Sequence, residues 1–176
     1  MLQNKVFLEI LKTRNVSKTY VSWLNDYDTV KYTDQKNFTH TIKSTIDYLK
    51  NNQKKNNQIM YAIYVKDQKK KIHVGNIKLG PINLNHNYSE MSYFIGDKNF
   101  LNKGIATEAI SKIIKIAKSK YKLSKLIAGT YSNNIASQKV LLKNKFKKEA
   151  DFRSQLVFEK ERVDHYWYGL VLKSYE

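Results

Sequence analysis

The chain has 176 residues, with 32 lysines and arginines against 15 aspartates and glutamates, and a formal net charge of +17. Its length suits one domain, and 41% hydrophobic residues are enough for a packed core, which excludes a disordered chain. There is no cysteine, which excludes disulfides, thiolate zinc sites and a cysteine nucleophile. No apolar run approaches the roughly 18 residues of a membrane span, and residues 1–12 lack a signal-peptide pattern, so we expect a cytoplasmic protein.

The positive charge is unevenly distributed along the chain. Residues 98–148 hold 13 lysines and one acid, Glu108, whereas the rest of the chain holds 19 basic and 14 acidic groups. A local field of this size attracts phosphates, although many of these lysines could simply be solvated on helix surfaces. Only three of the basic residues are arginines, the side chain that base recognition favours, so a nucleic-acid partner is the weaker interpretation.

The hydrophobic pattern predicts a mixed α/β (α+β) domain over residues 1–176. In chain order we expect a strand (6–11), two helices (17–25, 41–51), three strands (58–65, 72–79, 88–95), a helix (104–121), a strand (125–131), a helix (134–144) and two strands (156–159, 165–172). Ser17 is a candidate N-cap, and residues 67–71 are a candidate polar hairpin tip. The predicted fold is a central, mostly antiparallel sheet of about seven strands flanked by about four helices, with one parallel crossover within residues 88–144.

The loop at residues 96–103, between a strand and the longest helix, is the most informative segment. The backbone N–H groups that open a helix are unpaired, and with the helix dipole they form an anion site. Gly104 and Ala106 are small, so a phosphate could approach the backbone closely. The loop lacks both the Gly-Lys-Ser/Thr ending of a Walker loop and the third glycine of a dinucleotide fingerprint. From the residues alone, a diphosphate site and an ordinary strand-to-helix turn both remain open.

Residues 102–109, Asn-Lys-Gly-Ile-Ala-Thr-Glu-Ala, resemble the acetyl-CoA pyrophosphate loop of the GNAT acetyltransferases. Gly104 and Ala106 match the last two positions of that family's Gln/Arg-x-x-Gly-x-Gly/Ala pattern, and Leu101 stands where Gln or Arg is commoner. Residues 134–146 are similar to the family's Asn-x-x-Ser-x-x-Val-Leu-x-x-x-Gly-Phe helix, with Lys145 in place of the glycine. Residues 89–95 and 20–26 resemble the preceding strand and the opening helix. The resemblance covers essentially the whole chain, and is greatest to the branch that holds the ribosomal-protein N-terminal and amino-sugar-nucleotide acetyltransferases.

This resemblance implies the GNAT fold and direct transfer of an acetyl group from acetyl-CoA to a primary amine, without a metal. It implies that residues 91–95 splay from the next strand, that pantetheine pairs with their exposed backbone, and that a backbone N–H near Tyr93 polarises the thioester. The implied cofactor-binding residues are Tyr93, Phe94, Ile95, Leu101, Asn102, Lys103, Gly104, Ile105, Ala106, Thr107, Asn134 and Ser137.

The attacking amine must be neutral, so a base or a chain of waters is expected. Glu90 is the first candidate base, because this branch often carries a glutamate at that position; the alternative is an exposed carboxylate paired with a lysine. His40 is the second candidate, with a capping or surface role as its alternative. The remaining histidines, His73, His86 and His165, are less favourable. The tyrosine that often protonates the CoA thiolate falls at Leu141, so water or another residue, such as Ser137 or Tyr131, must serve.

The acceptor amine is the least constrained feature. Residues 20–41 resemble GNAT enzymes that acetylate nucleotide-linked amino sugars in the synthesis of surface glycans, which predicts an acceptor site of Tyr32, Lys36, Phe38 and His40. Lys31 and Lys36 are expected to contact the diphosphate of such a substrate. The alternatives are the N-terminus of a ribosomal protein and, outside enzymes, a basic RNA-binding module. No acidic cluster suited to a polyamine is present in the sequence. We expect a monomer or a homodimer with no membrane partner.

Overall fold

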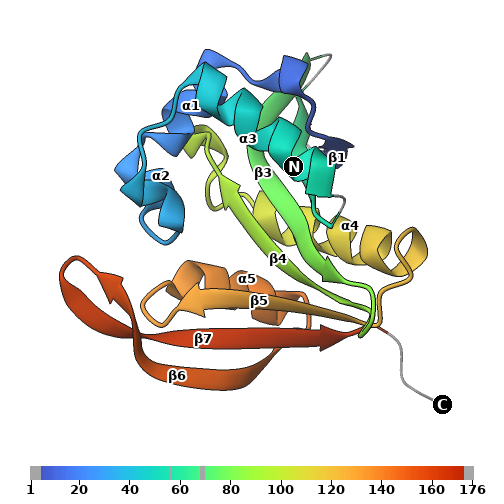
Figure 1. The fold of residues 1–176 in the computed structure, drawn as a ribbon, viewed down its shortest axis with the longest axis vertical. Helices are drawn as coiled ribbons and strands as arrows, with labels where there is room; N and C mark the ends of the chain where they lie inside the picture. The colour runs from blue at the N-terminus through green and yellow to red at the C-terminus, as the bar shows by residue number, and fades with distance from the viewer. Residues whose placement is uncertain (1–4, 56, 68–69, 173–176) are drawn as a thin grey trace.

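One seven-stranded sheet organises the chain (Figure 1). The computed structural model describes residues 5–55, 57–67 and 70–172. The strands are β1 (Lys5–Ile10), β2 (Ile59–Asp67), β3 (Lys70–Asn83), β4 (Tyr88–Ile95), β5 (Lys125–Tyr131), β6 (Lys147–Phe158) and β7 (Glu161–Val171). Their order across the sheet is β1-β2-β3-β4-β5-β7-β6, and every neighbouring pair is antiparallel except β4 and β5. The mixed α/β prediction and its single parallel crossover are confirmed.

Five α-helices occur among the described residues, one more than predicted. They are α1 (Lys18–Leu24), α2 (Tyr27–Val30), α3 (Ile42–Lys55), α4 (Ile105–Ser119) and α5 (Ile135–Lys143). The extra one, α2, is a single turn, and four residues are too few to display a helical period. Three short 3-10 helices, at Thr13–Asn15, Asp34–Asn37 and Lys98–Phe100, complete the described elements. None of these helices has the length and apolar content needed to span a membrane.

Two hydrophobic cores lie on opposite faces of the sheet. Alternation along β2 sends Tyr61, Ile63 and Val65 into the larger core, which α4 covers, and Ala62 and Tyr64 into a smaller core under α1 and α3. The Ser17 Oγ accepts a hydrogen bond from the Tyr20 N–H at 3.1 Å and caps α1, as predicted. The sheet therefore separates the long helix α4 from the N-terminal helices (Figure 1).

The last two strands are longer than the sequence predicted. β6 begins at Lys147 rather than at residue 156, and β7 begins at Glu161 rather than at residue 165. β6 is the edge strand of the sheet, and most of its side chains are exposed on both faces. A strand without a buried face lacks the alternation of apolar residues from which strands are predicted, which explains the correction. In the predicted hairpin tip, Lys70 and Lys71 belong to β3, while positions 68–69 lie outside the described residues.

The turn after α5 keeps a glycine-type conformation although it carries a lysine. Lys145 has a φ of +67°, in the left-handed region. Its N–H donates to the Leu142 carbonyl at 2.9 Å, and the Phe146 N–H donates to the Leu141 carbonyl at 3.2 Å, the two bonds of a Schellman motif. The left-handed lysine costs on the order of 1 kcal/mol. In return, Phe146 enters the larger core and is only 1% exposed.

Candidate active site

The sheet opens between its two central strands. β4 and β5 pair at only three positions, Tyr88–Lys125, Ser89–Leu126 and Glu90–Ile127. Beyond them, Met91–Ile95 of β4 pairs with β3 alone, while the rest of β5 pairs with β7. The two strands diverge in Figure 1, so one backbone edge of β4 faces an opening in the middle of the sheet. This divergence matches the splay that the family resemblance implies, and it leaves backbone donors and acceptors available to an extended ligand.

The start of α4 has the geometry of an anion site. Gly104 is the N-cap with a φ of +77°, and a Cβ built there would meet nothing within 4 Å. The first helical bond runs from the Glu108 N–H to the Gly104 carbonyl, so the N–H groups of residues 105–107 have no partner within the helix. Ile105 is 3% exposed and anchors this end of the helix in the larger core. The positive end of the helix dipole and three free N–H groups therefore face space that a phosphate could enter.

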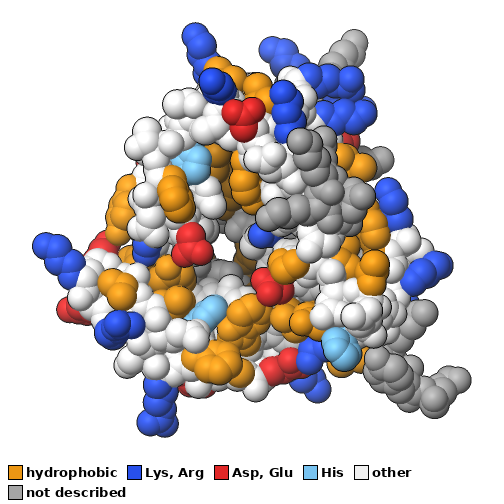
Figure 2. All heavy atoms as spheres, viewed as in Figure 1, with side chains coloured by type: hydrophobic (Ala, Val, Ile, Leu, Met, Phe, Trp, Pro, Cys, Tyr) orange, Lys and Arg blue, Asp and Glu red, His pale blue; other side chains and the backbone are white. Residues whose placement is uncertain are grey.

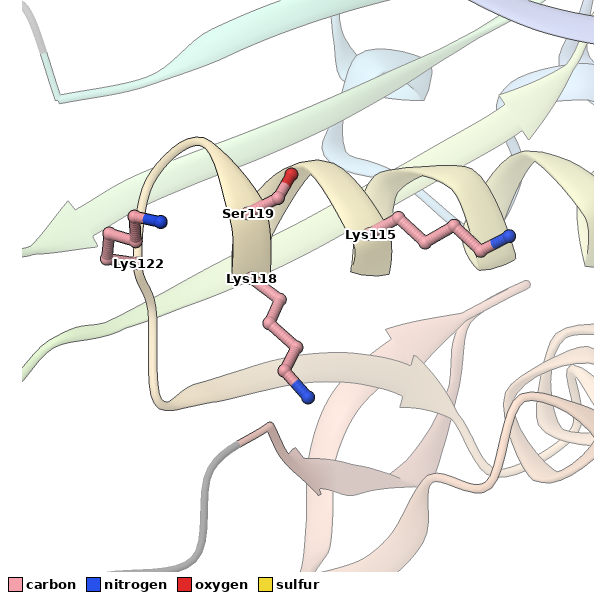
Figure 3. A pocket seen from close by; sticks show the side chains of 4 residues that line it. All are labelled: Lys115, Lys118, Ser119 and Lys122. Atoms are coloured by element: carbon pink, nitrogen blue, oxygen red, sulfur yellow. The ribbon is translucent and has the colours of Figure 1, made fainter.

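The lysines of residues 98–148 do not all surround this helix start. Lys115, Lys118 and Lys122 line a separate pocket with Ser119 at the other end of α4 (Figure 3). That pocket lies about 22 Å along the helix from Gly104, near the negative end of the dipole. Lys112 and Lys125 form ion pairs with Glu108 and Glu149 at 3.5 and 2.6 Å. Part of the positive charge of residues 98–148 therefore lies at the far end of α4 or in ion pairs, and the backbone N–H groups at the helix start remain the better-defined candidate site for a phosphate.

Tyr93 connects β4 to α5 beside the opening. Its hydroxyl lies 3.0 Å from the Ser137 Oγ. Burial raises the pKa of Tyr93 to about 12, and the hydrogen bond to Ser137 lowers it in part, so the phenol is protonated at neutral pH. The Asn134 Oδ1 accepts from the Ser137 N–H at 3.2 Å and caps α5, which leaves the amide NH₂ for a ligand. Leu141, whose hydrocarbon side chain has no proton to donate, is fully buried in the larger core.

A pocket of about 630 Å³ lies on the face of β3 and β4 that α1 and α3 cover. Its walls come from α1, the segment of residues 32–40, the first turns of α3, and strands β2, β3 and β4. Aromatic rings and neutral polar groups dominate the lining, which includes Tyr20, Tyr32, Phe38, Tyr48, Phe94, Thr33, Gln35, His40, Thr45, Asn76 and Ser92. Figure 2 shows a hollow near the middle of this view, with lysines and arginines mostly around the outline.

The pocket is nearly balanced in charge. Among its described lining residues, Asp34 is the only carboxylate and Lys78 the only ammonium. No carboxylate of the described chain lies within ion-pair distance of the Lys78 Nζ. A polycation would therefore find one acidic partner here, whereas a neutral molecule with hydroxyl groups would find many.

The predicted acceptor residues separate into two groups. Phe38 and His40 line the pocket, and Phe38 is 64% exposed at its rim. Tyr32 also lines it, but its ring stacks on Phe158 with centroids 4.9 Å apart. Lys36 is absent from the lining: its Nζ donates to the carbonyls of Lys31 and Val157, each at 3.2 Å, and lies 5.0 Å from the centroid of the Tyr131 ring.

This placement corrects two expectations about lysines. Lys36 joins the N-terminal segment to the β6–β7 hairpin instead of facing the pocket. Lys31 pairs with Asp28 at 3.5 Å, also away from the pocket lining. Asn76 and Lys78 are pocket residues that the sequence analysis did not predict. The signal was available, because the alternation of side chains along β3 puts both on one face of the strand.

The two candidate bases lie in different pockets. Glu90 is on the same face of β4 as Ser92, but it lines a second pocket, with Pro81, Leu84 and Tyr88. The His40 Nε2 lies 3.3 Å from the Gln35 carbonyl, so Nε2 is the donor in this hydrogen bond, and Nδ1 has no partner among the described residues. Of the other histidines, His86 follows β3 in a turn, His165 hydrogen-bonds to Gln155, and His73 is half-buried against Trp23 of α1. No group of three or more potential metal ligands occurs among the described residues.

Several solved structures share this fold. A spermidine N-acetyltransferase from Vibrio cholerae in complex with CoA and spermine matches with a TM-score of 0.84 at 14% identity, over 95% of each chain. A ribosomal-protein alpha-N-acetyltransferase in complex with coenzyme A matches with a TM-score of 0.82 at 14% identity, over 96% of this chain and 94% of that one. An N-acetyltransferase from Staphylococcus aureus Mu50 is 21% identical, with a TM-score of 0.76 over 96% and 99% of the two chains.

The family assignment rests on the sequence. No curated protein matches this chain, but a family model described as an acetyltransferase (GNAT) domain matches residues 7–147. That range runs from β1 through the sheet opening, the start of α4 and α5. The chain belongs to the GNAT family, and it is an N-acetyltransferase with acetyl-CoA as its co-substrate.

Proposed function

We propose that this enzyme acetylates the primary amine of a nucleotide-linked amino sugar, with acetyl-CoA held across the sheet opening. The N–H groups at the start of α4 suit a pyrophosphate, because Gly104 leaves the approach open and the dipole favours an anion. The unpaired edge of β4 from Met91 onward suits the amides of pantetheine, which can pair with it as an added strand. Both features support the cofactor-binding residues implied by the sequence.

The chemical step needs a polarised carbonyl and a proton for the leaving thiolate. The backbone N–H groups near Tyr93 lie on the open edge of β4, where one can donate to the thioester carbonyl oxygen. The hydroxyls of Tyr93 and Ser137, which lie 3.0 Å apart between β4 and α5, are candidate proton donors beside this edge. They would take the place of the acid missing at Leu141, and both are neutral at the pH of the cell.

The amine would reach the thioester from the face of the sheet that carries Ser92 and Phe94. Glu90 projects from that face of β4 at the point where pairing with β5 ends, and this position supports it as the base. His40 lines the larger pocket with a free Nδ1 and is the second candidate. The two candidates differ in position. Glu90 is on β4, the strand proposed to hold the thioester, whereas His40 lies in the wall of the larger pocket.

The lining of the larger pocket is the observation that favours an amino sugar as the acceptor. Aromatic faces such as Phe38 pack against sugar rings and nucleobases, and the neutral polar groups match hydroxyls. Lys78, rather than the predicted Lys31 and Lys36, is the cation available to a diphosphate. A peptide N-terminus, the substrate class in the name of one structural neighbour, is the second candidate, since the same polar groups could bind peptide amides. A polyamine would face only Asp34.

We predict that acetyl-CoA binding depends on the open space at Gly104. Gly104→Asp places a negative charge against the diphosphate and should raise the acetyl-CoA Kd by about tenfold or more in titration calorimetry. Gly104→Asn is the matched control, because asparagine has the same shape and tolerates a positive φ. Equal Kd values for the wild type and both folded variants would show that the diphosphate binds elsewhere.

We predict that Glu90→Gln keeps acetyl-CoA binding but lowers kcat/KM by roughly 10²-fold or more, the usual effect of removing a general base. Raising the pH should restore part of the rate, because more of the amine is then neutral. His40→Gln is the companion variant, since its amide can still donate to the Gln35 carbonyl. A wild-type rate in Glu90→Gln with a large loss in His40→Gln would transfer the role to His40.

The acceptor is tested by thiol release with a panel of amines. It should contain a UDP-linked 4-amino-4,6-dideoxy sugar, the free amino sugar, spermidine and a ribosomal-protein N-terminal peptide. We predict the highest kcat/KM for the nucleotide-sugar, and a KM that rises about tenfold in Lys78→Gln for this substrate but not for the free sugar. Lys31→Gln, a lysine outside the pocket, should change neither KM. Faster turnover of the peptide or of spermidine would refute the amino-sugar assignment.

A further inference from the structure

A buried asparagine without a complete set of partners lies at the base of the larger pocket. Asn76 of β3 lines this pocket and is only 2% exposed. Its register partner on the neighbouring strand β4 is Phe94. Lys78 of β3 and Ser92 of β4 are the next register pair on the same face of the sheet. Within the described part of the chain, no group accepts a hydrogen bond from the Asn76 Nδ2. Such a buried donor costs about 1–3 kcal/mol when it stays unpaired.

A β-bulge places a histidine beside this asparagine. The pairing of β2 with β3 passes from Ile63–Gly75 to Tyr64–His73, so Val74 has no partner on β2. Val74 packs in the larger core, which puts His73 and Asn76 together on the opposite face although they are three residues apart. The His73 ring is held among aromatic rings, with centroids 5.1 Å from Trp23 and 5.2 Å from Tyr64.

The histidine fixes the orientation of the amide. The His73 Nε2 lies 2.9 Å from the Gly75 carbonyl and 3.0 Å from the Asn76 Oδ1. Since the carbonyl can only accept, Nε2 must carry a proton, and Asn76 must present its oxygen to that proton. Burial lowers the pKa of His73, so the ring is neutral at neutral pH and this arrangement persists. The NH₂ group is therefore the part of the amide that has no partner among the described residues, on a side chain that lines the pocket.

We infer that the Asn76 NH₂ donates to an oxygen of the acceptor molecule, with His73 as the positioning residue, and that it selects amines bearing a hydroxyl or carbonyl near the amino group. An amino sugar and a peptide N-terminus both supply such an oxygen, whereas a simple alkylamine or a polyamine has no oxygen, and its protonated nitrogens supply only donors. The inference rests on the proposed function in that the pocket must receive the amine. It adds a residue that discriminates among amines by one hydrogen bond.

The test compares amines that differ by one oxygen, trans-2-aminocyclohexanol and cyclohexylamine, with thiol release as the readout. With kcat/KM expressed per concentration of neutral amine, the wild type should favour the amino alcohol by about tenfold, the effect of one buried hydrogen bond. Asn76→Leu removes the donor and should bring this ratio close to 1. Asn76→Asp keeps an oxygen for His73 but removes the donor, and should lower the ratio as well. A ratio is independent of the fraction of folded enzyme, and Asn76→Asp keeps the shape of the side chain if Asn76→Leu fails to fold.

Asn52→Leu is the matched control. Asn52 is a second buried asparagine whose Nδ2 has no partner in the described chain, and it lies outside the pocket lining. Its replacement should leave the ratio at the wild-type value. A wild-type ratio near 1, a ratio that survives in the Asn76 variants, an equal fall in Asn52→Leu, or turnover of oxygen-free amines alone would overturn the inference. Poor turnover of nucleotide-sugars with the oxygen preference intact would instead refute the proposed substrate and leave the role of Asn76 standing.

Discussion

The end of the pairing between β4 and β5 is the constraint on which the rest of the site depends. The strands separate after Glu90 and Ile127, so the sheet has one half built on β3 and β4 and another built on β5, β7 and β6. Backbone groups in the middle of a sheet need partners, and here a ligand can supply them. The two strands diverge in Figure 1, and Tyr93, on the strand edge that this separation leaves unpaired, contacts Ser137 of α5 and also lines the larger pocket.

The proposed phosphate site is supported by backbone geometry more than by net charge. The lysines that dominate the sequence are spread over ion pairs and a pocket at the far end of α4 (Figure 3). The start of α4 offers fixed N–H groups and the positive end of the dipole, which require no flexible side chain to be ordered. The larger pocket likewise contains one fixed amide, Asn76, which is held by His73, together with the ammonium of Lys78.

Local patterns predicted most of the fold and the strand–loop–helix around Gly104. The stripe of apolar residues marked α4, and Ser17 marked the start of α1, because these signals act within a few residues. The single-turn α2 and the exposed edge strand β6 carry no such signal. The sequence also could not show that Lys36 turns toward Val157, 121 residues away, or that a bulge brings His73 to Asn76. Those contacts depend on tertiary packing and on a register shift.

Hydrogen–deuterium exchange with and without acetyl-CoA tests the central claim most directly. If the co-substrate pairs with the open edge of β4 and its pyrophosphate binds the start of α4, the amides of residues 91–95 and 102–107 should exchange more slowly in its presence. The lysine-lined end of α4, at residues 115–122, should exchange at the same rate in both samples. Protection at residues 115–122 without protection of the β4 edge would contradict the proposed binding of acetyl-CoA in the sheet opening.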